Sequence, residues 1–242
     1  MNRSSVDPGS SLQLLFPKMG TIDVVSDSTV SRLGVLAERR WGMFTTAQAE
    51  SVGVSRKQLV RMTANGVLER LTQGVYRMAG APPQENESIY ATWLALGGAT
   101  SQTTTAGAPS LVAAGVTAAV VHDIGDFFLD GTDFIVGSRK TTRLPDVRLR
   151  IRPLTPADTT SVHGLPTLTV ERTITDLLDL GTDTSLIDDA LREAARFGKI
   201  TDPQRLRDDL ATTPSRLRDD AGVLLDSLNE VLAPNTEAAL HG

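Results

Sequence analysis

The sequence predicts an α+β fold, with an N-terminal winged helix-turn-helix, then a small mixed α/β domain and a helical C-terminal region. Three observations predict it. Short amphipathic segments with a glycine turn fill residues 31–66, two strand-like runs follow, and the apolar period becomes helical near residue 170. The predicted division is a flexible tail at 1–28, the winged helix at 29–80, a linker at 81–87 and the α/β domain at 88–242.

Two short helices begin the winged helix. Ser31 is the expected N-cap of the first, because its hydroxyl can accept hydrogen bonds from the first turn, and that helix ends near residues 41–42. Thr45 or Thr46 is expected to cap the second helix, at 47–51. These short elements are typical of the first part of a helix-turn-helix.

The third helix is the expected recognition helix. Gly53 supplies the turn before it, since glycine enters left-handed conformations without a clash, and Ser55 caps it. Leu59 and Met62 lie three residues apart and should face the core. The other side of the helix carries Arg56, Lys57, Val60, Arg61 and Ala64. A helix of this layout can lie in the major groove of DNA.

Two strands, at 67–71 and 74–78, are expected to form the wing. Arg70, Gln73 and Arg77 lie in this hairpin, where they could touch the flanking DNA backbone or the minor groove.

Positive charge gathers on this module. Residues 30–80 hold eight Lys and Arg against three Glu, a net charge of +5, so the remaining residues must carry −10 to reach the total of −5. A cationic patch on an acidic protein favours a phosphate backbone as its partner. The alternative is that short helices with a glycine turn occur in many helical domains and that surface arginines are usually only solvated. The residues expected to bind DNA are Thr45, Thr46, Ser55, Arg56, Lys57, Gln58, Arg61, Arg70, Gln73 and Arg77.

The second domain begins after prolines at 82–83, which block helix and ladder hydrogen bonds. Its expected helices lie at 88–96 and 110–114, from 170 onward, after a cap and proline at 202–203, and at about 215–232. Its expected strands are 118–121, 127–129, 134–136 and 147–152, with an edge strand at 165–168.

The run at 147–152 alternates strictly, which predicts Val147, Leu149 and Ile151 inward and three arginines outward. With its neighbours, this basic stripe comprises Arg139, Lys140, Arg143, Arg148, Arg150 and Arg152. It is interpreted mainly as the solvated face of an amphipathic sheet; extending a DNA footprint or binding an acidic partner are the alternatives. Arg172 and Asp176, one helical turn apart, are expected to form a weak helix pair.

Three segments carry a resemblance to a known family: WGMFTTAQA at 41–49, GVSRKQL at 53–59 and GVLERLTQGVYR at 66–77. The run 36–80 resembles the N-terminal domain of AbiEi-family antitoxins, the repressor half of an abortive-infection toxin–antitoxin pair. The segment at 164–181 is similar to a strand-then-helix element of their C-terminal half. The resemblance implies a protein that represses its own promoter at inverted repeats as a homodimer on DNA, while its C-terminal half neutralises a nucleotidyltransferase-like toxin.

No enzyme is expected. A nucleotidyltransferase needs two aspartates one residue apart to hold Mg²⁺, but after Gly137 and Ser138 the pair reads Asp146 and Arg148. The Glu-x-Lys triplet of restriction nucleases, G-x-S-x-G, H-E-x-x-H and a P-loop are all missing from the sequence. The three histidines, His122, His163 and His241, are isolated, and there is no cysteine. No catalytic residue, metal or cofactor is therefore expected.

The sequence has no apolar run of about 18 residues and no secretory signal, so a cytoplasmic protein without a membrane span is expected. Three rivals to the antitoxin remain: a stand-alone winged-helix regulator with a partner-sensing second domain, a protein-interaction module and a divergent nuclease.

Overall fold

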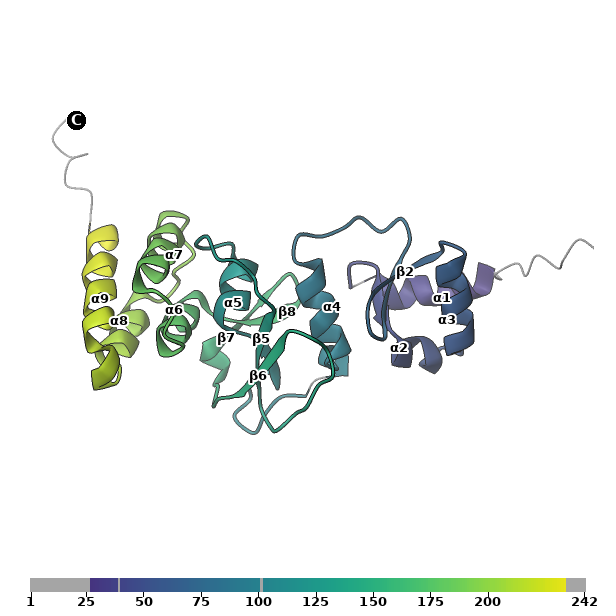
Figure 1. Cartoon of the computed structure of the whole chain (residues 1–242), viewed down its shortest axis with the longest axis horizontal. Helices are drawn as coiled ribbons and strands as arrows, with labels where there is room; N and C mark the ends of the chain where they lie inside the picture. The colour runs from purple at the N-terminus through teal and green to yellow at the C-terminus, as the bar shows by residue number, and fades with distance from the viewer. Residues whose placement is uncertain (1–26, 39, 101, 234–242) are drawn as a thin grey trace, which may run out of the picture.

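A computed structural model describes residues 27–38, 40–100 and 102–233, which form a row of three parts (Figure 1). The winged helix lies at one end, a sheet lies in the middle, and a group of helices lies at the other end. The predicted α+β class and the N-terminal winged helix are confirmed. Most of the predicted tail falls outside the described residues.

The winged helix combines three helices with a three-stranded antiparallel sheet of order β1-β3-β2. Its elements are α1 (Asp27–Ala37), β1 (Met43–Thr45), α2 (Thr46–Ser51), α3 (Arg56–Ala64), β2 (Leu68–Thr72) and β3 (Val75–Met78). The second helix and both wing strands lie within one residue of their predicted bounds, and the third helix starts after its predicted cap, Ser55. Strand β1 is an addition that the sequence pattern did not indicate.

The prediction for the first helix was wrong at both ends. Ser31 lies inside α1 and is not its cap. The buried stripe of this helix starts one turn earlier, at Thr29, and continues through Leu33 and Ala37. The helix ends at Ala37, and the chain then turns through left-handed conformations at Trp41 (φ 53°) and Gly42 (φ 77°).

The middle part is a five-stranded mixed sheet of order β6-β5-β4-β8-β7. Its strands are β4 (Leu111–Ala113), β5 (Thr132–Val136), β6 (Val147–Ile151), β7 (Thr159–Val162) and β8 (Leu165–Leu168). Helices α4 (Glu87–Ala95) and α5 (Gly115–His122) contact it. Strand β6 pairs parallel with β5, and β4 pairs parallel with β8, so both connections cross over.

Four predictions for this part were wrong. The segment 110–114 contains β4 and not a helix, 118–121 lies in α5 and not in a strand, and 127–129 forms no strand. The segment 165–168 is a strand, but it lies inside the sheet because β7, which was not predicted, is the edge. The apolar runs at 110–114 and 118–121 were assigned wrongly because a largely buried segment has no polar period that distinguishes helix from strand.

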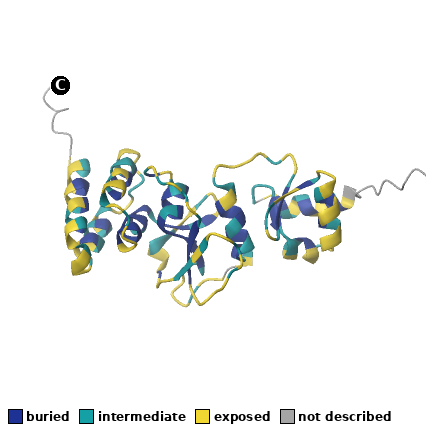
Figure 2. Cartoon of the chain, in the orientation of Figure 1, coloured by how far each residue is buried: buried dark blue, intermediate teal, exposed yellow. Residues whose placement is uncertain are grey.

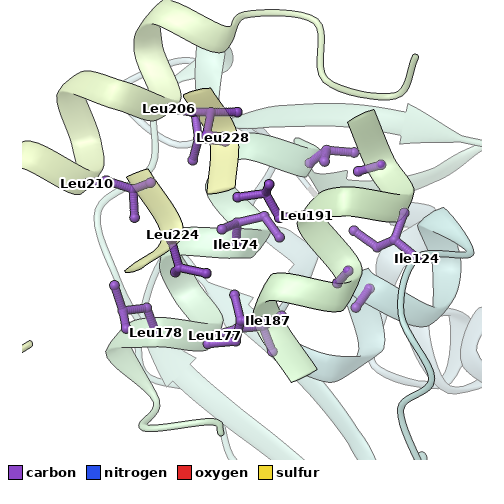
Figure 3. Close-up of a cluster of buried hydrophobic side chains, with 14 of the residues drawn as sticks. Ile124, Ile174, Leu177, Leu178, Ile187, Leu191, Leu206, Leu210, Leu224 and Leu228 are labelled. Atoms are coloured by element: carbon purple, nitrogen blue, oxygen red, sulfur yellow. The ribbon is translucent and has the colours of Figure 1, made fainter. Parts of the chain in front are cut away.

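The last part is built from α6 (Val170–Asp179), α7 (Thr184–Arg196), α8 (Pro203–Ala211) and α9 (Arg218–Leu232). Figure 3 shows the buried leucines and isoleucines that these helices direct at one another. Asp202 caps α8 and Pro203 occupies its first turn, as predicted. A short 3₁₀ turn, Ser215–Leu217, precedes α9, so the last predicted helix is also confirmed.

The winged helix shares a core with the middle part. Met43 and Val75 belong to the same apolar cluster as Ile89 of α4 and Phe134 of β5. Trp41 stacks on Tyr90 of α4, with 4.5 Å between the ring centroids. The two parts are therefore packed against each other and are not joined only by a flexible linker.

Candidate nucleic-acid interface

Local capping fixes the starts of α2 and α3. The backbone N–H of Gln58 donates to Ser55 Oγ (3.3 Å), and the Gln58 side chain accepts from the backbone N–H of Ser55 (2.8 Å). Thr45 and Gln48 form the same reciprocal box at α2. Thr45, Ser55 and Gln58, all predicted to bind DNA, thus have a structural task at the helix starts.

Helix α3 has the two-sided layout that its sequence predicts. Leu59 and Met62 are at most 1% exposed and pack against Leu33 and Phe44. Figure 2 shows exposed residues on the outward side of this helix. The exposed members are Arg56, Lys57, Val60, Arg61 and Ala64. This set is named the α3 surface here.

The cations of the α3 surface differ in their surroundings. Arg56 pairs with Glu50 of α2 at 2.9 Å, although the Arg56 side chain stays 77% exposed. Among the described residues, Lys57 has no ion pair. A patch this exposed is screened by water and is available to phosphate groups.

The tip of the wing lies beside the start of α2. The backbone N–H of Thr46 donates to the carbonyl of Gly74 at 2.8 Å, and its hydroxyl donates to the same oxygen at 3.3 Å. Arg70 and Gln73 are exposed on this hairpin. The Arg70 Nε atom donates only a long bond of 3.4 Å to the carbonyl of Thr72. The structure therefore gathers Thr46, Arg70 and Gln73 near α3.

Arg77 does not belong to this surface. Its side chain is only 11% exposed, and it forms ion pairs with Glu69 of β2 and Glu87 of α4. Hydrogen bonding to Glu69, together with the charges of both glutamates, raises the pKa of Arg77 against the effect of burial. The predicted DNA contact is at odds with this placement, because the guanidinium instead joins the wing to α4.

A cleft of about 570 Å³ lies between the winged helix and the middle part. Its cations come from both sides, with α3 and the wing on one side and the loop between β5 and β6 on the other. Its lining includes Arg56, Val60, Arg70, Gln73, Lys140 and Arg143. Lys140 also donates to the carbonyl of Leu96, which holds that loop against the end of α4. The cleft matches a strand of phosphates in charge.

The basic stripe of the second domain is divided by the fold. Arg143 is exposed at the cleft, whereas Arg148 pairs with Asp133 at 3.2 Å and Arg150 pairs with Asp176 at 2.6 Å. Burial lowers the pKa of Arg150, but the hydrogen bonds and charge of Asp176 outweigh it and raise the pKa. The inward and outward prediction was thus wrong at two positions: Arg150 is 16% exposed, while Ile151 is 53% exposed.

Asp176 anchors this part of the fold. It is 1% exposed, and besides Arg150 it accepts a hydrogen bond from the backbone N–H of Gly115 at 2.9 Å. The predicted helix pair with Arg172 was wrong, since Arg172 donates to Thr175 instead. The true partner of Asp176 lies 26 residues away in sequence, beyond the reach of helical periodicity.

Glu171 is a second buried carboxylate, and the sequence pattern gave no sign of it. It is 2% exposed, and its Oε1 accepts hydrogen bonds from the backbone N–H groups of Thr201 (2.6 Å) and Asp202 (2.8 Å). Burial would raise the pKa of Glu171, but these donors hold it below its ordinary value. The carboxylate ties α6 to the start of α8, which is a structural role.

Within the described ranges, no three His, Cys, Asp or Glu side chains gather in a way that could hold a metal ion. None of the described helices combines the length and apolar character needed to cross a bilayer.

Comparisons with known proteins agree with the geometry. A family model described as "Transcriptional regulator, AbiEi antitoxin" matches residues 36–79, which include α2, α3 and the three-stranded sheet. No curated protein matches the chain. The crystal structure of the RV2827C protein from Mycobacterium tuberculosis is similar, with a TM-score of 0.50 and 18% identity over 83% of this chain and 77% of that one. At that identity the likeness shows the fold alone. Residues 36–79 match the AbiEi antitoxin family of transcriptional regulators, as the resemblance in the sequence predicted.

Proposed function

We propose that the chain is a DNA-binding transcriptional repressor that acts as the antitoxin of an AbiE-type pair. It represses its own operon at inverted repeats, and it neutralises a nucleotidyltransferase-like toxin. The observation that carries the DNA-binding part is the α3 surface, where Arg56 and Lys57 stand exposed on the side opposite the buried Leu59. An exposed basic face on the recognition helix of a winged helix is suited to the major groove.

In this proposal α3 lies in the major groove with its N-terminal turn towards the base edges. Arg56, Lys57 and Arg61 read bases or bind phosphates, since arginine and lysine pair with the acceptors of guanine. The wing residues Arg70 and Gln73 contact the backbone beside it. The loop that carries Lys140 and Arg143 faces the same cleft, which supports a flanking phosphate contact there.

An electrophoretic shift experiment on the DNA upstream of the gene tests the DNA-binding part. The wild-type chain is compared with Lys57→Ala/Arg61→Ala at several salt concentrations. Each substitution should weaken binding by about 1–3 kcal/mol if the side chain contacts guanine, and should only flatten the salt dependence if it contacts phosphate.

The matched control is Arg216→Ala/Arg218→Ala, which removes the same two charges from exposed positions at the far end of the molecule. This control should bind DNA as tightly as the wild type. Equal binding by the Lys57/Arg61 variant would contradict the assignment of α3. Absence of salt-dependent binding by the wild type would favour a protein-interaction module.

The antitoxin part is supported by the family match at residues 36–79. It is tested by co-expressing the chain with a neighbouring gene that carries a nucleotidyltransferase signature. Growth should be restored by the wild type and also by Lys57→Ala/Arg61→Ala, because neutralisation is assigned to the C-terminal half. A neighbourhood without such a gene would favour the stand-alone regulator.

A homodimer on inverted repeats and a cytoplasmic location complete the proposal. No catalytic activity is expected, and a plasmid-nicking assay with Mg²⁺ or Mn²⁺ tests the divergent nuclease. The complexes with DNA should contain two copies of the chain per pair of half-sites. Light scattering, which measures the mass of the complex, checks this.

A further inference from the structure

Val60 is the larger of the two apolar residues on the α3 surface, where the other members are basic. It lies in the middle of α3 and is 64% exposed. No apolar cluster of the described part of the chain includes it. Arg56 precedes it by one helical turn, and Ala64 follows it by one turn, so these side chains share one face.

Stability gives no reason for valine here. A β-branched side chain loses rotamer freedom in a helix, and an exposed one gains no burial in return. Exposure by itself assigns no role, since Val35 of α1 is 71% exposed. What distinguishes Val60 is its position: it lines the basic cleft together with Arg56 and Arg70.

The major groove offers one apolar group on its base edges, the C5-methyl group of thymine. A valine that presents two methyl groups between cations can contact that group, while the cations beside it pair with guanine or phosphate. Alanine at position 64 leaves room on the same face, because its side chain is a single methyl group.

We propose that Val60 reads a thymine by its methyl group, an inference that rests on the proposed function and specifies its DNA target. Four residues of helix span about 6 Å along the axis, close to two base-pair steps of about 3.4 Å. The operator therefore carries a thymine facing the middle of α3. A guanine read by Arg56 lies about two base pairs from it.

The experiment begins with selection of tight-binding duplexes from a random pool by the full-length chain. Each thymine of the selected site is then replaced, one at a time, by deoxyuridine, which removes only the methyl group. At one thymine the wild type should lose about fourfold in affinity, the worth of burying one methyl group. Val60→Ala should bind the thymine and deoxyuridine duplexes equally.

Val35→Ala is the matched control, since it shortens a similarly exposed valine on another helix. It should respond to deoxyuridine as the wild type does, and thermal melting should find both variants folded. Wild-type binding that ignores deoxyuridine at every thymine overturns this inference and leaves the proposed function standing. A fourfold loss that persists in Val60→Ala also overturns it. Failure of the wild type to bind DNA overturns both.

Discussion

The arginines of α3 and those of β6 are alike in sequence and opposite in the structure. In α3, Arg56 is 77% exposed and meets one acidic side chain, Glu50, at the surface. In β6, Arg150 is 16% exposed and is paired with Asp176, which is 1% exposed. Both segments carry basic residues among apolar ones, although only β6 alternates them strictly. The difference lies in the carboxylates that the fold brings up to them.

This contrast indicates two roles for the basic residues, one in the stability of the fold and the other at the exposed surface of α3. Asp133 of β5 pairs with Arg148 within the sheet, and Asp176 of α6 pairs with Arg150, which joins the sheet to α6. Helix α2 places Glu50 beside Arg56, and Arg56, Lys57 and Arg61 all stay exposed. Breaking the β6 pairs should therefore cost stability, and altering α3 should change DNA affinity.

The largest effect is expected from Asp176→Ala. The change leaves Arg150, whose side chain is 16% exposed, without its counter-charge and the N–H of Gly115 without its acceptor. Removing one partner of a buried ion pair typically costs about 3–5 kcal/mol of unfolding free energy. Urea denaturation followed by circular dichroism measures it.

Lys57→Ala is the comparison, because it alters an exposed α3 cation and should change the unfolding free energy by no more than about 0.5 kcal/mol. At a temperature where Asp176→Ala is folded, the DNA affinity of Asp176→Ala should equal that of the wild type. If Lys57→Ala cost as much stability as Asp176→Ala, the contrast between the two regions would be wrong.

The next effect is expected from Glu171→Gln, which removes a buried charge that accepts hydrogen bonds from Thr201 and Asp202. The loss should be about 2 kcal/mol at pH 7, since hydrogen bonds to charged groups are the stronger kind. Because the folded-state pKa of Glu171 is lowered from 4.5, the native state binds this proton less readily than the unfolded chain does.

The stabilisation from Glu171 is therefore complete well above pH 4.5 and disappears as the pH falls through the lowered pKa. Denaturation curves of wild type and Glu171→Gln should converge as the pH falls below about 4.5. A difference in stability that stayed constant from pH 7 to pH 3 would contradict a charged Glu171 in the folded protein.

Local signals explain why the second and third helices and the wing could be predicted almost to the residue. Thr45 and Ser55 cap helices through hydrogen bonds to residues only three positions away, and Gly53 has a positive φ of 80° at the turn. Interactions of this range are visible in a sequence as spacing. The first helix was predicted to start too late, because its buried stripe begins at Thr29, before the predicted cap Ser31.

The middle part could be predicted less well because its decisive contacts are long-range. Asp176 meets Arg150 across 26 residues, and Glu171 meets Thr201 across 30. The same holds for the site. Arg77 was predicted to contact DNA from the wing, but in the folded protein it pairs with Glu69 and Glu87. Which arginines remain exposed is decided by tertiary partners, and no spacing rule carries that information.

A smaller effect is expected from Arg143→Ala, in the loop across the cleft from α3. If Arg143 neutralises one phosphate, its removal should lower the salt slope of DNA binding by about one and the affinity about fivefold at 0.15 M salt. Titrations at several salt concentrations measure both. Arg152→Ala, an exposed arginine just after β6, is the control and should leave the slope unchanged.

The smallest effect, and one of opposite sign, is expected from Glu50→Gln. Glu50 holds Arg56 at 2.9 Å and places a negative charge beside the surface proposed for phosphates. An exposed pair of this kind is worth at most about 1 kcal/mol, so its loss costs little stability. Freeing Arg56 and removing the repulsion should tighten DNA binding about threefold, measured by fluorescence anisotropy at low salt. Glu85→Gln removes the same charge from an exposed position away from this cleft and should have a smaller effect. Weaker binding by Glu50→Gln would mean that Glu50 orients Arg56 for a base, because competition with phosphate can only be relieved by removing the carboxylate.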